Sequence, residues 1–250
     1  MRVFNLIHLY PRELNLYGDT GNVFYISYFL SIFGIKTKIY YIEKGDSLPN
    51  KIDFIFAGGG PDSLQSSIYK DFLSKKGILY NHIHNNKPAL FICGSYQLLG
   101  KYYLTSNKEK IKGLNLFNFY TFSPNNQKKR LVGNSVICLD NFILTKTFKF
   151  SRYVVGFQNH NGRTILSKKL KPLGKVLNSS LGNDSRGGEG FYYNKTIGTY
   201  LHGPLLVKNP HILYFLLSDY LSSFSIPSYH LFYNEFITHY EFLHKNYNKF

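Results

Sequence analysis

The chain has 250 residues with 44% hydrophobic and 18% aromatic content, which excludes a disordered chain and predicts a folded protein with a sizeable core. Its formal net charge is +16, but the lysines are dispersed and no stripe alternates basic and aromatic residues, so we expect no nucleic-acid partner. Compositional drift explains this charge most simply, and attraction to an anionic membrane surface or an acidic partner is the alternative.

Two cysteines do not suggest a disulfide framework, and the first residues lack the layout of a signal peptide. A reducing, cytoplasmic location is therefore expected. The longest apolar stretch, residues 23–35, is too short to cross a bilayer and predicts a buried helix.

Strand-like and helix-like segments alternate through the first half of the chain. The expected helices are residues 22–33 and one or two pieces within residues 65–85. The expected strands are residues 2–9, 36–42, 53–57 and 89–92. This βαβα order predicts an α/β fold, with a mostly parallel sheet covered by helices on both faces.

The second half has a different pattern, in which short β-type runs are separated by Gly, Asn and Asp turns. These runs predict antiparallel or mixed strands at residues 135–139, 153–157, 190–193 and 197–200. Two helices are expected to follow, at about residues 210–221 and 229–245. No repeat or interdomain linker is visible, so we predict a single domain over residues 1–250, with C-terminal helices from about residue 209.

The most informative segment surrounds Cys93. The apolar run of residues 89–92 leads into this thiol, and Gly94 then opens a turn into helix-compatible sequence. Such a turn exposes a nucleophile at the end of a strand, beside a helix N-terminus whose N–H groups favour a thiolate. A buried structural cysteine is the ordinary alternative, but a plain core strand would not need this turn.

Three consecutive glycines, Gly58, Gly59 and Gly60, follow the strand expected at residues 53–57. Without side chains, their backbone N–H groups can turn inward and act as an oxyanion hole beside a nucleophile. An ordinary glycine-rich turn is the alternative. The spacing of a dinucleotide-binding fingerprint is absent.

A nucleophilic cysteine usually needs a base, and the chain has nine histidines. His202 follows the strand-like run of residues 196–201, which would place it at the sheet edge where strands end. His160 lies in a turn and is the main rival. The other histidines lie in ordinary strand or helix patterns.

The sequence lacks the common cofactor motifs. Residues 94–101 have one residue too many between the glycines for a phosphate loop, and Tyr102 replaces the required Ser or Thr. No zinc-ligand pattern is present, so no metal site is expected. These observations predict a thiol hydrolase without a cofactor or energy source of its own.

Taken together, the motifs resemble those of class I glutamine amidotransferases, specifically the cobyric-acid-synthase-like branch. The matching residues are 9–11, 15–19, 21–22, 58–60, 62, 65, 92–94, 96–100, 130, 133–134, 156–157, 159–160, 162–164, 198–206 and 208–210. They span nearly the whole chain in the family's order, and only together are they highly specific. Within this branch, the chain most resembles the GatD type, the amidotransferase subunit of lipid II isoglutaminyl synthase, whose partner is MurT.

The resemblance implies a role for each matching residue in the hydrolysis of L-glutamine. Cys93 would attack the side-chain amide, and His202 would protonate the departing ammonia. Backbone N–H groups of Gly59 or Gly60 and of Gly94 would hold the oxyanion.

The resemblance also implies how glutamine is seated and where its ammonia goes. Arg130 would pair with the α-carboxylate of glutamine, and Gln97 would help to seat the substrate. Ammonia would pass to a MurT-like Mur-ligase subunit that binds ATP and Mg²⁺ and amidates D-glutamate in the lipid II stem peptide.

The sequence departs from the family pattern at several positions. Ser95 stands where a second Gly is usual, Pro61 where a polar residue is commoner, and Gln158 where Glu is commoner. Many class I amidotransferases carry a catalytic Glu two residues after the histidine, where this chain has Pro204. We therefore expect either a Cys–His dyad or an acid from the partner chain. The same fold could also serve a corrinoid or other small-molecule synthetase, or be a catalytically dead scaffold.

Overall fold

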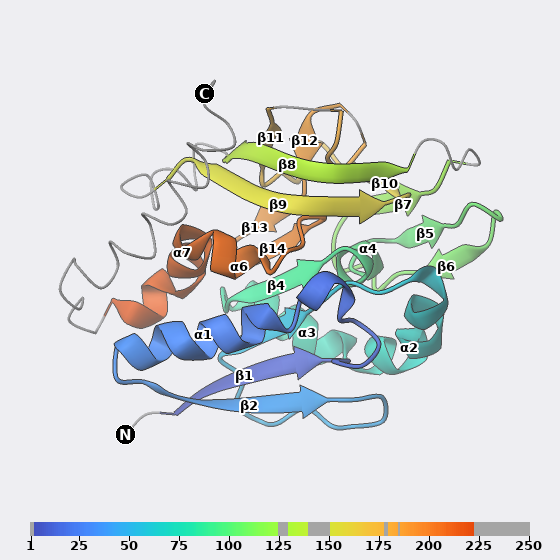
Figure 1. The fold of residues 1–250 in the computed structure, drawn as a ribbon. Coiled ribbons are helices and arrows are strands. Elements are labelled where there is room, and N and C mark those ends of the chain that lie inside the picture. The colour runs from blue at the N-terminus through green and yellow to red at the C-terminus, as the bar shows by residue number, and fades with distance from the viewer. Residues whose placement is uncertain (1–2, 125–129, 140–150, 178–179, 185, 223–250) are drawn as a thin grey trace.

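The computed structural model describes residues 3–124, 130–139, 151–177, 180–184 and 186–222. A six-stranded sheet forms the centre of the molecule (Figure 1). In spatial order its strands are β13 (Phe191–Tyr193), β14 (Thr196–Thr199), β4 (Ala89–Ile92), β3 (Phe54–Ala57), β1 (Val3–Leu9) and β2 (Lys36–Ile42). Every neighbouring pair is parallel except β13 with β14.

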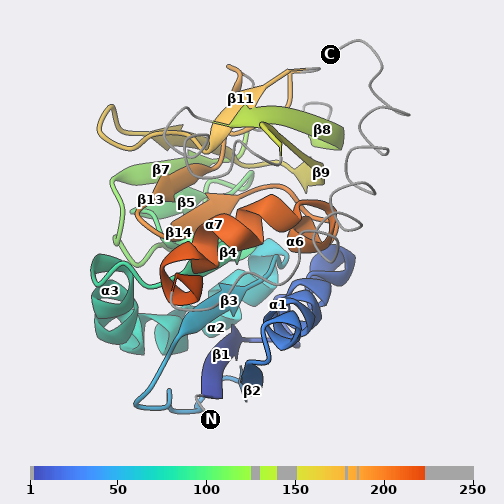
Figure 2. The same cartoon turned by 90° about the vertical axis from the view of Figure 1, so that its left-hand side faces the viewer.

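Helices cover both faces of this sheet. The longer helices are α1 (Gly21–Ile32), α2 (Asp62–Ser74), α3 (Lys76–His84) and α7 (Pro210–Leu221), and α4 (Gly94–Leu98) and α6 (Leu205–Lys208) are short. Figure 2 shows α1 and α7 on one face and α2 and α3 on the other. The predicted α/β class and the parallel sheet are therefore confirmed. The helix predicted at residues 229–245 lies outside the described residues.

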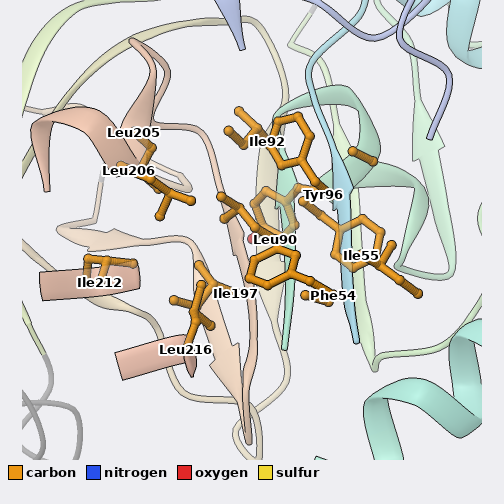
Figure 3. Close-up of a cluster of buried hydrophobic side chains, with 14 of the residues drawn as sticks. Phe54, Ile55, Leu90, Ile92, Tyr96, Ile197, Leu205, Leu206, Ile212 and Leu216 are labelled. Carbon is orange, nitrogen blue, oxygen red and sulfur yellow. The ribbon is translucent and has the colours of Figure 1, made fainter. Parts of the chain in front are cut away.

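The core lies between the sheet and its helices. Buried apolar side chains of β4 and β14 meet those of α6 and α7 in one cluster (Figure 3). Its members include Leu90, Ile197, Leu205, Leu206, Ile212 and Leu216. The prediction of a buried helix at residues 23–35 is corrected in one respect: Phe24 and Tyr28 of α1 are 59% and 52% exposed. A helix that covers one face of a sheet buries only the side that contacts the strands.

The second half of the chain adds two four-stranded sheets. One consists of β10 (Arg163–Leu166), β7 (Phe119–Phe122), β5 (Tyr102–Leu104) and β6 (Lys110–Lys112). The other consists of β12 (Gly188–Glu189), β11 (Gly174–Val176), β8 (Leu131–Leu139) and β9 (Tyr153–His160). The expectation of mixed strands is confirmed for these sheets. The run at residues 197–200, however, belongs to the central sheet, where β14 is parallel to β4.

Strand register fixes where the functional loops lie. Thr199 of β14 pairs with Ile92 of β4, and Ala57 of β3 pairs with Phe91 of β4. Because these strands are parallel and end at nearly the same level, the segments that follow them meet at one edge of the sheet. Among the described residues, no helix is long and apolar enough to cross a membrane.

The buried His8 should make the free energy of unfolding decrease at acid pH. This histidine is fully buried on β1 beside Tyr41 and Phe56, and neither ring nitrogen has a hydrogen-bond partner within the described residues. Burial lowers the pKa of His8 to about 4. As pH falls below 6.5, the unfolded chain binds a proton that the folded chain does not, so stability decreases until about pH 4.

The effect of His8 can be measured by chemical denaturation between pH 7 and pH 4. We expect His8→Leu to remove roughly 3 kcal/mol of the acid-dependent loss in unfolding free energy. His84→Gln, at an exposed histidine of α3, is the matched control and should leave the pH dependence unchanged. An identical pH dependence in His8→Leu and wild type would contradict this assignment.

Candidate active site

Cys93 lies on a strained elbow between β4 and α4. Its φ of 52° and ψ of −103° are unusual for a residue with a side chain. The Ser95 hydroxyl stabilises this turn because it donates to the Ala57 carbonyl at 2.8 Å and accepts from the Ile92 N–H at 2.9 Å. Ser95, which replaces the family's usual Gly, therefore ties the ends of β3 and β4 together.

His202 reaches the same place from the other end of the chain. Its backbone pairs with Phe157 of β9, donating at 2.8 Å and accepting at 3.1 Å, and its side chain is fully buried. A Cβ atom at Gly59 would lie 2.6 Å from Cε1 of His202 and 3.1 Å from Cβ of Cys93. The imidazole and the thiol thus meet beside this glycine.

Asp19 holds the other side of the imidazole. Its Oδ2 lies 3.0 Å from Nδ1 of His202, and both side chains are fully buried. Asp19 follows the 3-10 turn Leu16–Gly18, in which Tyr17 and Gly18 have φ values of 55° and 74°. The expectation of a dyad or of an acid from a partner chain is corrected, because this chain itself supplies a carboxylate to the histidine.

Electrostatics favour a charged imidazole. Burial alone would lower the pKa of His202, but the hydrogen bond with Asp19 and the proximity of the Cys93 and Asp19 groups raise it to about 10. His202 is therefore an imidazolium at neutral pH, beside the thiol of Cys93. The arrangement can attack a carbonyl carbon and then give a proton to a leaving amine.

Of the two glycines in this loop that were expected to donate to an oxyanion, only Gly60 has an available N–H group. The N–H of Gly59 donates to Oδ2 of Asp19 at 2.8 Å, so the expectation that Gly59 holds an oxyanion is corrected. Gly60 and Gly94 are adjacent, since a Cβ at Gly94 would lie 3.0 Å from N of Gly60. Neither N–H donates to another described residue, which leaves this pair as the candidate oxyanion hole.

A pocket of about 630 Å³ opens over Cys93. Arg130 lines it and is exposed. Its Nε donates to Oδ1 of Asn159 at 2.5 Å, and Nδ2 of Asn159 donates to the Tyr17 hydroxyl at 2.6 Å. The Tyr17 ring packs edge-on against His202, with ring centroids 4.8 Å apart. A chain of contacts therefore connects Arg130 to the catalytic histidine.

Gln97 also lines the pocket, but both ends of its amide already have partners. Its Nε2 donates to the Tyr200 hydroxyl and its Oε1 accepts from Nε2 of Gln65, each at 3.1 Å. The structure therefore gives Gln97 a part in shaping the pocket wall. At another of the departures from the family pattern, Pro61 precedes α2 with a φ of −66°, which proline adopts without strain.

His160 does not lie in a position to act as the base. Its ring stacks on Tyr200 at 3.6 Å, and its nitrogens contact the Gly162 carbonyl and Oε1 of Gln158. Burial lowers the pKa of His160 to about 3. Of the two histidines that the sequence singled out, His202 is the one beside Cys93.

Sequence reasoning missed Asp19, Tyr17 and Asn159 as functional residues. Asp19 could not be linked to His202 from the sequence, because 183 residues separate the two. All three lie within segments that carry the family resemblance, which was the one available signal.

Gly59 offers a direct test of this packing. We expect Gly59→Ala to lower kcat about 100-fold, because the added methyl group would push the imidazole and the thiol apart. Gly77→Ala is the matched control, since a Cβ there meets nothing within 4 Å. Activity assays and thermal unfolding of both variants check the prediction, and an active, stable Gly59→Ala would contradict it.

The fold and this site place the chain in the class of thiol hydrolases built on a parallel α/β sheet. Residues 7–210 match the CobB/CobQ-like glutamine amidotransferase domain, and the chain belongs to that family. The resemblance predicted from the motifs is thereby confirmed.

Two relatives match over most of the chain, and both are named lipid II isoglutaminyl synthase (glutamine-hydrolyzing) subunit GatD. The protein from Streptococcus pneumoniae is 35% identical over 90% of this chain and 85% of its own length. The protein from Staphylococcus aureus is 35% identical over 91% of this chain and 88% of its own length. The fold alone is shared with PurLQS from Thermotoga maritima, at a TM-score of 0.62 and 13% identity, over 88% of this chain and 100% of that chain.

Proposed function

We propose that this chain is the glutaminase subunit of an amidotransferase that supplies ammonia to an ATP-dependent partner. One observation carries the proposal: the Cys93 thiol and the Asp19-bound imidazole of His202 meet under a pocket lined by Arg130. The same geometry speaks against a catalytically dead scaffold, because each catalytic group has its supporting contacts.

The reaction follows from these groups in two half-reactions. The Cys93 thiolate attacks the side-chain carboxamide carbon of L-glutamine, and the N–H groups of Gly60 and Gly94 stabilise the oxyanion. The C–N bond breaks as His202 gives its proton to the departing nitrogen, which releases ammonia and leaves a glutamyl thioester. His202 then takes a proton from water, and the hydroxide that forms cleaves the thioester to glutamate and the free thiolate.

The acceptor we propose is the D-glutamate carboxyl of the lipid II stem peptide. Support comes from the two GatD relatives, which are named for lipid II isoglutaminyl synthase and match 85% and 88% of their own lengths. The partner would be a MurT-like Mur-ligase subunit that binds ATP and Mg²⁺ and activates the acceptor carboxylate. A corrinoid synthetase is the second candidate acceptor enzyme, because the family domain is CobB/CobQ-like.

Amide-¹⁵N glutamine tests the proposal. Incubated with the chain, its co-purifying ligase, ATP and lipid II, it should give lipid II that carries ¹⁵N in the amidated D-glutamate. Cys93→Ala should block this transfer, whereas added ammonium should restore amidation because the ligase remains intact. A corrinoid synthetase as the co-purifying protein, or no transfer to lipid II by the complete complex, would contradict the acceptor.

A contact with the inner face of the membrane is a separate part of the proposal. The formal net charge of +16 supports attraction to anionic lipids, and the lipid II acceptor lies at that surface. Sedimentation with anionic vesicles should show binding at low salt that added salt removes. Absence of binding at low salt would rule the contact out.

A further inference from the structure

The pocket over Cys93 contains two opposite charges. Among the described residues that line it, Asp62 is the acidic side chain and Arg130 the basic one. A free α-amino acid carries the complementary pair, an α-ammonium and an α-carboxylate group. The resemblance assigns Arg130 to the carboxylate, which leaves Asp62 as the acidic group that could meet the ammonium.

The Asp62 side chain is exposed, and a hydrogen bond from a neighbouring residue orients its carboxylate. Asp62 is the first residue of α2, two positions after Gly60 of the candidate oxyanion hole, and its surface is exposed. The Tyr103 hydroxyl, which also lines the pocket, donates to its Oδ2 at 3.0 Å. This bond orients the carboxylate and leaves Oδ1 available to a ligand.

Within the described residues Asp62 forms no ion pair, and the ion pairs present involve other acids. Partial burial raises the pKa of Asp62, and the Tyr103 hydrogen bond and the positive charge of Arg130 act in the opposite direction and limit that rise. An ammonium group placed beside Oδ1 would gain a charge-assisted hydrogen bond.

Asp62 also has a purely structural explanation. An acidic residue in the first turn of a helix interacts favourably with the helix dipole. That role accounts for a carboxylate at this position, but it does not require exposure to the pocket. The two explanations predict different results, since an acid that interacts only with the helix dipole affects every substrate equally.

We propose that Asp62 binds the α-ammonium group of the substrate while Arg130 binds its α-carboxylate. This inference rests on the proposed glutaminase function and extends it to specificity. Because Asp62 and Arg130 each bind one charged group of the substrate, the site accepts free glutamine. It rejects glutamine residues within peptides, which lack both the α-ammonium and the α-carboxylate group.

Kinetics with trimmed substrates test the assignment. We compare L-glutamine with 4-carbamoylbutanoate, which lacks the α-ammonium group, in the full chain with its partner. Asp62→Asn should lower kcat/KM for L-glutamine by about 10- to 100-fold, mainly through KM, and lower it much less for 4-carbamoylbutanoate. Tyr103→Phe should give a smaller loss with the same selectivity. Asp219→Asn, an exposed acid on α7, is the charge-matched control.

Alkylation of Cys93 tests the role of Asp62 in binding without requiring that the protein hydrolyse glutamine. The rate at which 2-amino-5-chloro-4-oxopentanoate alkylates Cys93 should fall in Asp62→Asn, while the slower rate with 5-chloro-4-oxopentanoate should change little. Equal losses with both reagents, or no loss with either, would overturn the role of Asp62. Wild-type protein that labels selectively but releases no glutamate would instead contradict the proposed function and leave the ammonium assignment supported.

Discussion

Replacing Cys93 with alanine is expected to abolish the release of glutamate from glutamine, with a loss of at least about 10⁴-fold in kcat. The reason is chemical, because no other described thiol lies near His202. Cys138, on β8, faces Lys175 of the neighbouring strand and is remote from the elbow. Glutamate release by the chain, alone and with its partner, is the measurement.

Cys138→Ser is the matched control for this experiment and should retain wild-type activity. Thermal unfolding of both variants separates lost chemistry from lost fold. Glutaminase activity that survives in Cys93→Ala would refute the nucleophile assignment.

Replacing Asp19 with asparagine is expected to lower kcat by about 10²- to 10⁴-fold. The carboxylate holds Nδ1 of His202 and accepts the N–H of Gly59, so an amide would weaken both contacts. Because Asp19 supports the imidazolium without reaching the substrate, KM should change much less than kcat.

The pH profile gives Asp19→Asn a second readout. The raised pKa of His202, about 10, means that the imidazolium and its contribution to stability are present below pH 6.5 and are lost as pH rises through about 10. Wild-type kcat/KM should therefore fall on the alkaline side near pH 10. In Asp19→Asn this alkaline limb should move toward pH 6.5, and an unmoved limb would show that Asp19 does not set the charge of His202.

The central sheet could be predicted because each of its first strands is a distinct apolar run followed by a helical pattern. Residues 36–42 and 89–92 were expected as strands with the bounds that β2 and β4 have. The strands β5 and β6 were not expected. They have three residues each, and such short strands are determined by their pairing partners rather than by their own sequence.

The same distinction applies to the site: residues in short sequence motifs could be predicted, whereas contacts between distant segments could not. Cys93 and the glycine loop are local patterns, and His202 follows from a strand end, so the sequence predicted them. The Asp19–His202 contact joins a turn before α1 to the segment after β14, and the Arg130–Asn159 contact joins the starting end of β8 to β9. These pairs depend on the tertiary fold, which also shows that the Gly59 N–H belongs to Asp19 rather than to an oxyanion.

The glutamyl thioester on Cys93 is the most direct test of the account. Acid-quenched mixtures of the chain and isotopically labelled L-glutamine, digested and analysed by mass spectrometry, should place the labelled glutamyl group on the peptide that contains Cys93. A labelled adduct on Cys138, or glutamate release without any adduct on Cys93 under conditions that trap thioesters, would contradict it.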